Sequence, residues 1–135
     1  MKPISEVKEI VQKLETKLKS ANTSEYGKKE TFEEFVKPLF ESLGWNFATD
    51  VSKEESVSQN KADYGFKIND VTRFYLTTVP LDQSLENREL IISLTTFAFN
   101  RGVTWGVLTN FRKIRLYLSE ARGSLLQMQF FELSS

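Results

Sequence analysis

Hydrophobic residues recur with helical spacing in two stretches near the start of the chain. Over Ile4–Ser20 they fall three or four positions apart, and Lys and Glu occupy the opposite face, which predicts an amphipathic helix. Lys28–Leu43 repeats the pattern and ends before Gly44, a residue type that often follows a helix. Pro38 lies inside this second helix, where we expect a kink or one unpaired carbonyl.

The next part of the chain reads as extended. We expect a strand over Trp45–Val51 and a charged, polar loop over Ser52–Asn60. The segment Lys61–Asp82 then predicts two strands joined by a tight turn at Asn69 and Asp70. Alternation predicts a core-facing set on the first strand, with Asp63 and Lys67 on the other face. That core-facing set is Ala62, Tyr64, Phe66 and Ile68.

The second half predicts one more helix and three more strands. Ser84 is the expected N-cap of a helix over Leu85–Asn100, which ends at Arg101-Gly102. The strands are expected over Val103–Thr109, Ile114–Ser119 and Leu125–Glu132. The order α-α-β-β-β-α-β-β-β describes an α/β fold in which helices flank a mixed central sheet.

Composition limits the domain count and the chemistry. With 135 residues, 40% hydrophobic and 27% charged, the chain predicts a single domain over residues 1–135. The formal net charge is zero, so any nucleic-acid contact requires a local basic patch. The absence of Cys and His excludes thiolate and imidazole chemistry, and a metal would be Mg²⁺ or Mn²⁺ held by oxygen ligands. Without a signal sequence or an apolar span, the expected location is the cytoplasm and no membrane contact is expected.

A local basic cluster near the C-terminal end is the candidate DNA-binding surface. Arg112, Lys113 and Arg115 fall within four positions of one another, with Arg101 and Arg122 nearby in the sequence. Such side chains contact nucleic-acid phosphates. The alternative interpretation of the cluster is a solvated turn and strand face.

Four segments, in order, carry a family resemblance. They are KETFEEFVKPLFESLGW, Asp63-Tyr64, Phe74–Pro80 and TFAFNRGVTWGVLTNFRKIRLY. Over about residues 28–117 they resemble the N-terminal nuclease domains of type I restriction R subunits and related restriction–modification proteins. In the same order, the family motifs are the entry helix, the Ala-Asp-Tyr strand, the Phe-x-x-Glu-Ala-Lys-Pro strand, and the later helix and strand with a Thr-Asn-Gly turn. The resemblance implies the PD-(D/E)xK restriction-endonuclease-like core.

In that family an Asp and a Glu on adjacent strands hold a divalent metal, and a Lys orients the attacking water. Carried over by position, Asp63 is the Asp, whereas Thr77 stands for the Glu and Val79 for the Lys. Glu30 supplies the further carboxylate that some members bring from the first helix, so Asp63 and Glu30 would be the metal ligands. A Gln that is often found on the later helix falls at about Ser93.

A neutral hydroxyl is a poor magnesium ligand, and Val donates nothing. The resemblance therefore implies a nuclease-like domain without catalysis or cofactor, which binds DNA or serves as a regulatory scaffold in a restriction–modification or mobile-element system. Its expected partners are DNA and other restriction–modification subunits. Asp63 then remains as a turn or capping acceptor, and Glu30 as a favourable charge at a helix start.

Two alternatives stay open. In the first, the chain is an active Mg²⁺- or Mn²⁺-dependent endonuclease whose site has moved to other side chains, with Lys67, Asp82, Glu86 or Glu89 as the candidates. In the second, it is a protein-interaction or oligomerisation module that uses the helix over Ile4–Ser20 or a sheet edge. The sequence leaves the oligomeric state open.

Overall fold

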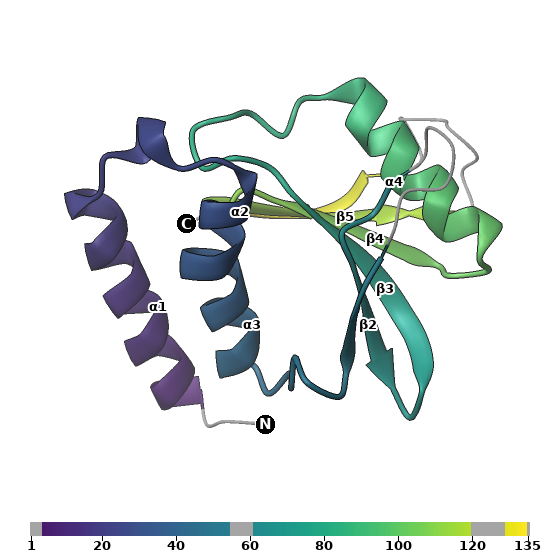
Figure 1. Ribbon diagram of the computed structural model, residues 1–135, viewed down its shortest axis with the longest axis horizontal. Helices are drawn as coiled ribbons and strands as arrows, with labels where there is room; N and C mark the ends of the chain where they lie inside the picture. Colours follow the sequence, from purple (N-terminus) through teal and green to yellow (C-terminus); the bar gives the residue numbers. More distant parts are fainter. Residues whose placement is uncertain (1–3, 55–60, 120–128, 135) are drawn as a thin grey trace.

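The computed structural model describes residues 4–54, 61–119 and 129–134 of the 135-residue chain, the last segment as backbone only. Within these residues, six strands form one sheet in the order β1-β2-β3-β4-β5-β6. Helices α1, α2 and α3 lie on one face and α4 on the other (Figure 1). The predicted α/β class, a mixed sheet flanked by helices, is therefore confirmed.

The first helix, α1 (Ile4–Ser20), has the predicted bounds. Leu14 is buried, and Ile10 and Leu18 pack against the same core cluster. Lys17 on its outer side pairs with Glu34 of the next helix at 3.0 Å. The apolar stripe therefore packs α1 onto the rest of the domain. Among the described residues, no helix is long and apolar enough to cross a membrane.

The second helix is continuous but irregular. It consists of α2 (Lys28–Thr31), a π-helical turn η2 (Phe32–Val36) and α3 (Lys37–Ser42). The Lys37 N–H donates to the Phe32 carbonyl, five residues earlier. Pro38 lacks an N–H and its ring crowds the carbonyl four residues before it, so a wider turn relieves the clash. The irregularity predicted at Pro38 takes this form.

The strand predicted over Trp45–Val51 is wrong, because most of that segment forms a turn. Asn46 accepts a hydrogen bond from Ala48 N on its side chain at 2.9 Å, and its carbonyl accepts from Asp50 N at 2.7 Å. Such local bonds compete with strand pairing. Only β1 (Val51–Lys53) is extended, and it pairs antiparallel with β2.

The hairpin at the centre of the sheet has the predicted turn. β2 (Tyr64–Ile68) and β3 (Val71–Thr78) pair antiparallel, and both turn residues have positive φ, 52° at Asn69 and 64° at Asp70. Two such residues define a type I′ turn, whose twist matches that of the strands. The second half of β3 is buried on both sides, as expected for a central strand.

The single core-facing set predicted for the first strand of the hairpin is wrong at both ends. Phe66 is fully buried on the α1–α3 side, but Ala62 belongs to the cluster on the α4 side. Ile68 is 49% exposed, because the turn of the hairpin projects from the body of the domain (Figure 1). Alternation along the strand is interrupted by a register shift after Phe66.

Helix α4 (Arg88–Asn100) starts three residues later than predicted. Asn87, not Ser84, is its N-cap, and the Asn87 side chain accepts from Leu90 N at 3.0 Å. Ser84 instead accepts from Glu86 N at 2.9 Å within the preceding loop. Both residue types cap helices well, so the local pattern did not separate them. The helix ends as predicted, with Gly102 at a φ of 69°.

Strand β4 (Trp105–Thr109) runs parallel to β3, and β5 (Lys113–Leu118) and β6 (Gln129–Ser134) follow antiparallel. Of the strand predicted over Leu125–Glu132, residues 125–128 lie outside the described segments, and β6 contains the rest. The predicted element order is confirmed, with the second helix counted once.

Two clusters of buried residues fill the space between the layers. On the α1–α3 side, the cluster is rich in stacked and edge-on aromatic rings, to which several of the eleven Phe residues contribute. On the α4 side it is mostly aliphatic. The α4-side cluster comprises Ala62, Tyr75, Val79, Leu85, Ile91, Leu94, Phe97, Ala98, Val103, Leu108 and Tyr117. Strand β3 contributes to both clusters, so it fixes both helical layers relative to the sheet.

Candidate functional site

Asp63 lies immediately before β2, where the backbone holds it between two strands. Its N–H donates to Leu76 O of β3 at 2.9 Å, and its carbonyl accepts from Glu54 N at 2.9 Å. These bonds continue the sheet pairing one residue beyond β2 on each side. The position of Asp63 is therefore set by the sheet itself, not by a mobile loop.

The Asp63 carboxylate is engaged through both oxygens. Oδ2 accepts from the backbone N–H of Thr78 at 2.8 Å, and Oδ1 lies 2.6 Å from the Nζ of Lys28 in the first turn of α2. The Asp63 side chain is 17% exposed, and that of Lys28 is 49% exposed. One carboxylate thus ties together the end of β3, the start of β2 and the helix on that face.

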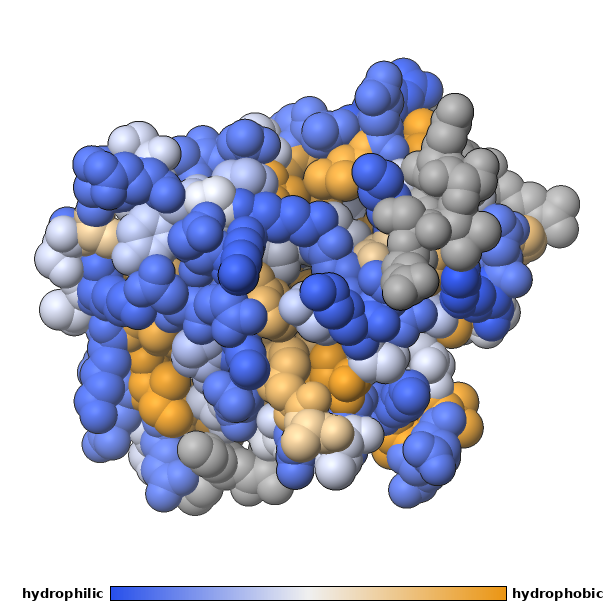
Figure 2. Space-filling model, viewed as in Figure 1, coloured by the Kyte–Doolittle hydropathy of each residue, from blue (hydrophilic) through white to orange (hydrophobic). Residues whose placement is uncertain are grey.

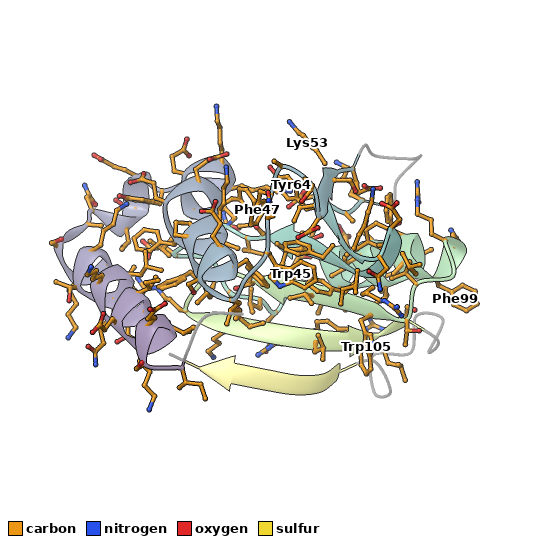
Figure 3. All side chains as sticks on the ribbon, turned by 90° about the horizontal axis from the view of Figure 1, so that it is seen from below. Trp45, Phe47, Lys53, Tyr64, Phe99 and Trp105 are labelled. Atoms are coloured by element: carbon orange, nitrogen blue, oxygen red, sulfur yellow. The ribbon has the colours of Figure 1, made fainter. Side chains whose placement is uncertain are left out.

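The Asp63 carboxylate opens onto a hollow of about 340 Å³, the Asp63 hollow. Three lysines and three carboxylates balance the formal charge of its lining. The rings of Phe32 and Tyr64 stack there at 4.3 Å. In Figure 3, Tyr64 and Lys53 lie on the same side of the molecule, with Lys53 extending outward. The lining residues are Lys28, Lys29, Phe32, Glu33, Lys53, Glu54, Asp63, Tyr64 and Thr78.

The surroundings of Tyr64 in the Asp63 hollow keep its phenol neutral. Burial raises the pKa of the Tyr64 phenol, and the nearby charges of Glu33 and Asp63 raise it further. Tyr64 therefore stays protonated and can donate a hydrogen bond. Across residues 4–54 and 61–119, three or more acidic side chains do not gather into a group that could hold a metal.

The structure places Thr77 and Val79 away from the Asp63 hollow. Both are buried, at 1% and 3% exposure, and Val79 belongs to the α4-side cluster. Thr77 has the same parity on β3 as Val79, so its side chain lies on that face as well. Thr78, between them, lines the hollow and supplies the N–H that binds Asp63.

The sequence reasoning did not single out Thr78. Alternation along the strand puts Thr78 on the same face as Phe74 and Leu76, which pack on the α1–α3 side, and this pattern could have indicated its position. Within the described residues, the buried hydroxyls of Thr77 and Thr78 have no hydrogen-bond partner. The resembled motif predicts Thr77 and Val79 as the neighbours of Asp63, whereas the structure has Thr78 beside it.

Glu30 is not part of the hollow. Its Oε1 accepts from the backbone N–H of Gly27 at 3.1 Å, at the start of α2. Glu30 thus lies in the first turn of α2, where a negative charge is favourable, and its role stays a prediction. Ser93, the position of the family Gln, accepts from Lys61 N at 2.7 Å.

The predicted basic cluster surrounds a second hollow of about 350 Å³, the Arg115 hollow. Two of its cations pair with carboxylates: Arg112 pairs with Asp82 at 3.2 Å, and Arg115 pairs with Glu86 at 2.7 Å. Asp82 and Glu86, two of the candidates for a displaced nuclease site, are thus engaged here. The hollow is lined by Leu81, Asp82, Gln83, Ser84, Leu85, Glu86, Asn110, Arg112, Lys113 and Arg115.

The outlying members of the basic cluster lie elsewhere. The Arg101 guanidinium lies over the ring of Phe97, 3.6 Å from its centroid, at the end of α4. Arg122 falls outside the described residues. Among the described residues, the fold brings Arg112, Lys113 and Arg115 together at this hollow.

Comparison with protein families, with characterised proteins and with solved structures finds no match to this chain. What is established is an α/β fold with a mixed sheet, an engaged carboxylate at the start of β2, and two polar hollows.

Proposed function

We propose that this chain is a restriction-endonuclease-like domain that binds DNA without cutting it, in a restriction–modification or mobile-element system. One observation carries the proposal. The Asp63 carboxylate, which the resemblance assigns to the metal, contacts the Lys28 ammonium at 2.6 Å and the Thr78 N–H at 2.8 Å. An internal cation thus lies where the family's chemistry needs a metal ion.

The arrangement of strands supports the nuclease-like part. Asp63 and the Thr77–Val79 segment lie on adjacent antiparallel strands, as the resemblance requires of the Asp and the Glu-x-Lys positions. Asn69 and Asp70 join those strands through a tight turn, so the two positions are brought together by local sequence.

The residues at the positions that the resemblance assigns to the metal site do not fit a catalytic magnesium ion. Thr77 contributes no charge, and Val79 belongs to the α4-side cluster. Glu30 is bound to the backbone of Gly27. Magnesium dehydrates reluctantly and requires anionic oxygen ligands. Binding to Asp63 would also require displacement of Lys28, so we derive no metal-dependent step.

The DNA-binding part is supported by where the cations lie. The formal net charge is zero, yet Lys28, Lys29 and Lys53 line one hollow, and Arg112, Lys113 and Arg115 line the other. Lysine and arginine contacts to phosphates supply most of non-specific DNA affinity. Local cation groups on a neutral chain predict weak binding that salt weakens further.

Fluorescence anisotropy with a labelled DNA duplex tests this proposal. Affinity is expected to fall steeply as salt rises, and Arg112→Gln with Lys113→Gln is expected to reduce the salt slope by up to about two phosphate contacts. Binding that is independent of salt, or undetectable at low salt, would refute DNA binding. In parallel, supercoiled plasmid incubated with Mg²⁺ or Mn²⁺ is expected to stay intact.

A protein-interaction role is the second candidate, because apolar residues are exposed at two ends of the domain. Ile68 and Val71 flank the hairpin turn with 49% and 52% exposure, and Ile4 is 73% exposed. On the face shown in Figure 2, apolar areas are divided by hydrophilic ones, so no single broad patch dominates that face. Light scattering that gives a dimer, together with no DNA binding, would favour this candidate.

A further inference from the structure

The Arg115 hollow is built from two loops that lock onto each other. Asn110 in the β4–β5 turn is only 6% exposed, and its side chain donates to Gln83 O at 2.8 Å and accepts from Lys113 N at 2.9 Å. On the other loop, Leu81 N donates to the buried hydroxyl of Thr31 at 2.9 Å. The walls of the hollow are therefore fixed before any ligand arrives.

The turn that carries the cations is also held in a strained conformation. Phe111 has a φ of 73°, a region that bulky residues rarely adopt, and it is 4% exposed. Its ring packs against Phe35 at 5.0 Å, which anchors the turn in the α1–α3-side core. Strain of this kind persists where the surrounding packing enforces it, and it is common at ligand-binding sites.

The ion pair in the hollow is asymmetric. The Arg115 side chain is 8% exposed, whereas its partner Glu86 is 70% exposed, with Nη2 and Oε1 2.7 Å apart. Arg115 belongs to a paired strand, and Glu86 lies in the loop before α4. Folding thus fixes and desolvates the cation, whereas the exposed carboxylate can move aside when another anion takes its place on Arg115.

The charge of Arg115 is secure despite this burial. Burial alone lowers the pKa of the guanidinium, but the hydrogen bond and negative charge of Glu86 help to outweigh it, so the pKa is raised. A guanidinium recognises carboxylate and phosphate through the same planar fork of N–H donors. Glu86 therefore occupies a position that a phosphate group also suits.

We infer that the Arg115 hollow is a phosphate-binding site for a nucleic-acid strand, and that Glu86 is an internal anion that the phosphate displaces. Arg115 forms the floor of the site, and Arg112 and Lys113 line it and add positive charge. Glu86 offsets the charge of Arg115, so only a strand that also gains contacts elsewhere binds well. The biological identity of the ligand rests on the proposed DNA binding; the anion site itself does not.

Two substitutions in the full chain test the inference. Glu86→Gln keeps the size of an exposed side chain and removes the competing charge, so it is expected to raise affinity for inorganic phosphate by about fivefold. Arg115→Lys keeps the positive charge but loses the planar guanidinium fork, and is expected to lower the affinity for inorganic phosphate. Lys8→Gln, which removes an exposed cation of α1 that lines neither hollow, is the matched control and is expected to change nothing.

The measurement is an NMR titration of amide resonances with inorganic phosphate, repeated with a single-stranded oligonucleotide with and without a 5′-phosphate. Shifts at Lys113 and Gln83 that saturate at lower phosphate in Glu86→Gln support the site. Equal or weaker binding in Glu86→Gln overturns it. Preference for the 5′-phosphorylated strand identifies a terminal phosphate as the ligand, and equal binding of both strands identifies a backbone phosphate.

The same variants separate this inference from the proposed function. If the duplex binds but neither Glu86→Gln nor Arg115→Lys changes its affinity, the phosphate site is refuted and DNA binding stands. If phosphate binds in the hollow as expected but no DNA binds, the site stands and the proposed function fails.

Discussion

Replacing Asp63 separates a structural carboxylate from a catalytic one. In Asp63→Ala, the Thr78 N–H loses its acceptor in a residue that is only 2% exposed. An unpaired buried donor costs about 1–3 kcal/mol. The Lys28 pair is also lost, but Lys28 is 49% exposed, so this adds at most about 1 kcal/mol. We expect a total loss of about 2–3 kcal/mol in the free energy of unfolding.

Asp63→Asn is the matched variant, because its amide oxygen still accepts from the Thr78 N–H while the charge is removed. The expected loss is below about 1 kcal/mol, close to that of Lys28→Gln, which removes the other half of the ion pair. Urea unfolding followed by tryptophan fluorescence at Trp45 and Trp105 measures all three. Equal effects of Ala and Asn would refute the role assigned to the Thr78 bond. A gain in stability in either Asp63 variant would indicate a carboxylate held for chemistry at the expense of stability.

Three further predictions concern the sheet, α4 and the tyrosines. Thr77→Glu with Val79→Lys, which restores the family motif, is expected to destabilise the fold by about 3 kcal/mol or more and to give no nuclease, because both side chains are buried; metal-dependent cutting by this variant would contradict the placement. Asn87→Ala is expected to cost about 1 kcal/mol and Ser84→Ala much less in urea unfolding, since only Asn87 caps α4. Burial raises the pKa of Tyr64 and Tyr75 above the ordinary value of 10.0. Their contribution to the free energy of unfolding is therefore complete below about pH 10 and is lost as the pH rises through the raised pKa values. The urea midpoint, measured from about pH 9 to 11, is expected to fall less in Tyr64→Phe than in the unmodified chain.

Periodicity and turn chemistry predicted most of the architecture. The helix over Ile4–Ser20, the apolar face of the helix that ends at Asn100 and the turn at Asn69-Asp70 each depend on residues within a few positions of one another. Such local preferences survive folding when they agree with the tertiary packing. Where two local solutions competed, as for the helix cap before Arg88 and for the segment 45–50, side-chain hydrogen bonds within a few positions decided the outcome, and periodicity alone does not distinguish these solutions.

The candidate site was less predictable, because its contacts span the chain. Lys28 in the first turn of α2 pairs with Asp63 before β2, and Glu86 in the loop before α4 pairs with Arg115 of β5. The resembled motif pointed to Thr77 and Val79, yet the neighbour of the carboxylate is Thr78. The basic cluster was found from the closeness of its residues in the sequence, but nothing in their spacing indicated that Arg115 is the buried member.

A nicking assay on supercoiled plasmid and single-stranded DNA with Mg²⁺ or Mn²⁺ tests most directly whether the Asp63–Lys28 ion pair replaces a metal site. The unmodified chain, Asp63→Asn and Lys28→Gln are compared at equal concentration. If Lys28 stands in place of a metal ion and the other ligands are lost, none of the three cuts either substrate. Cutting that requires metal and disappears in Asp63→Asn would contradict this, and cutting gained in Lys28→Gln would show an intact metal site beneath the ion pair.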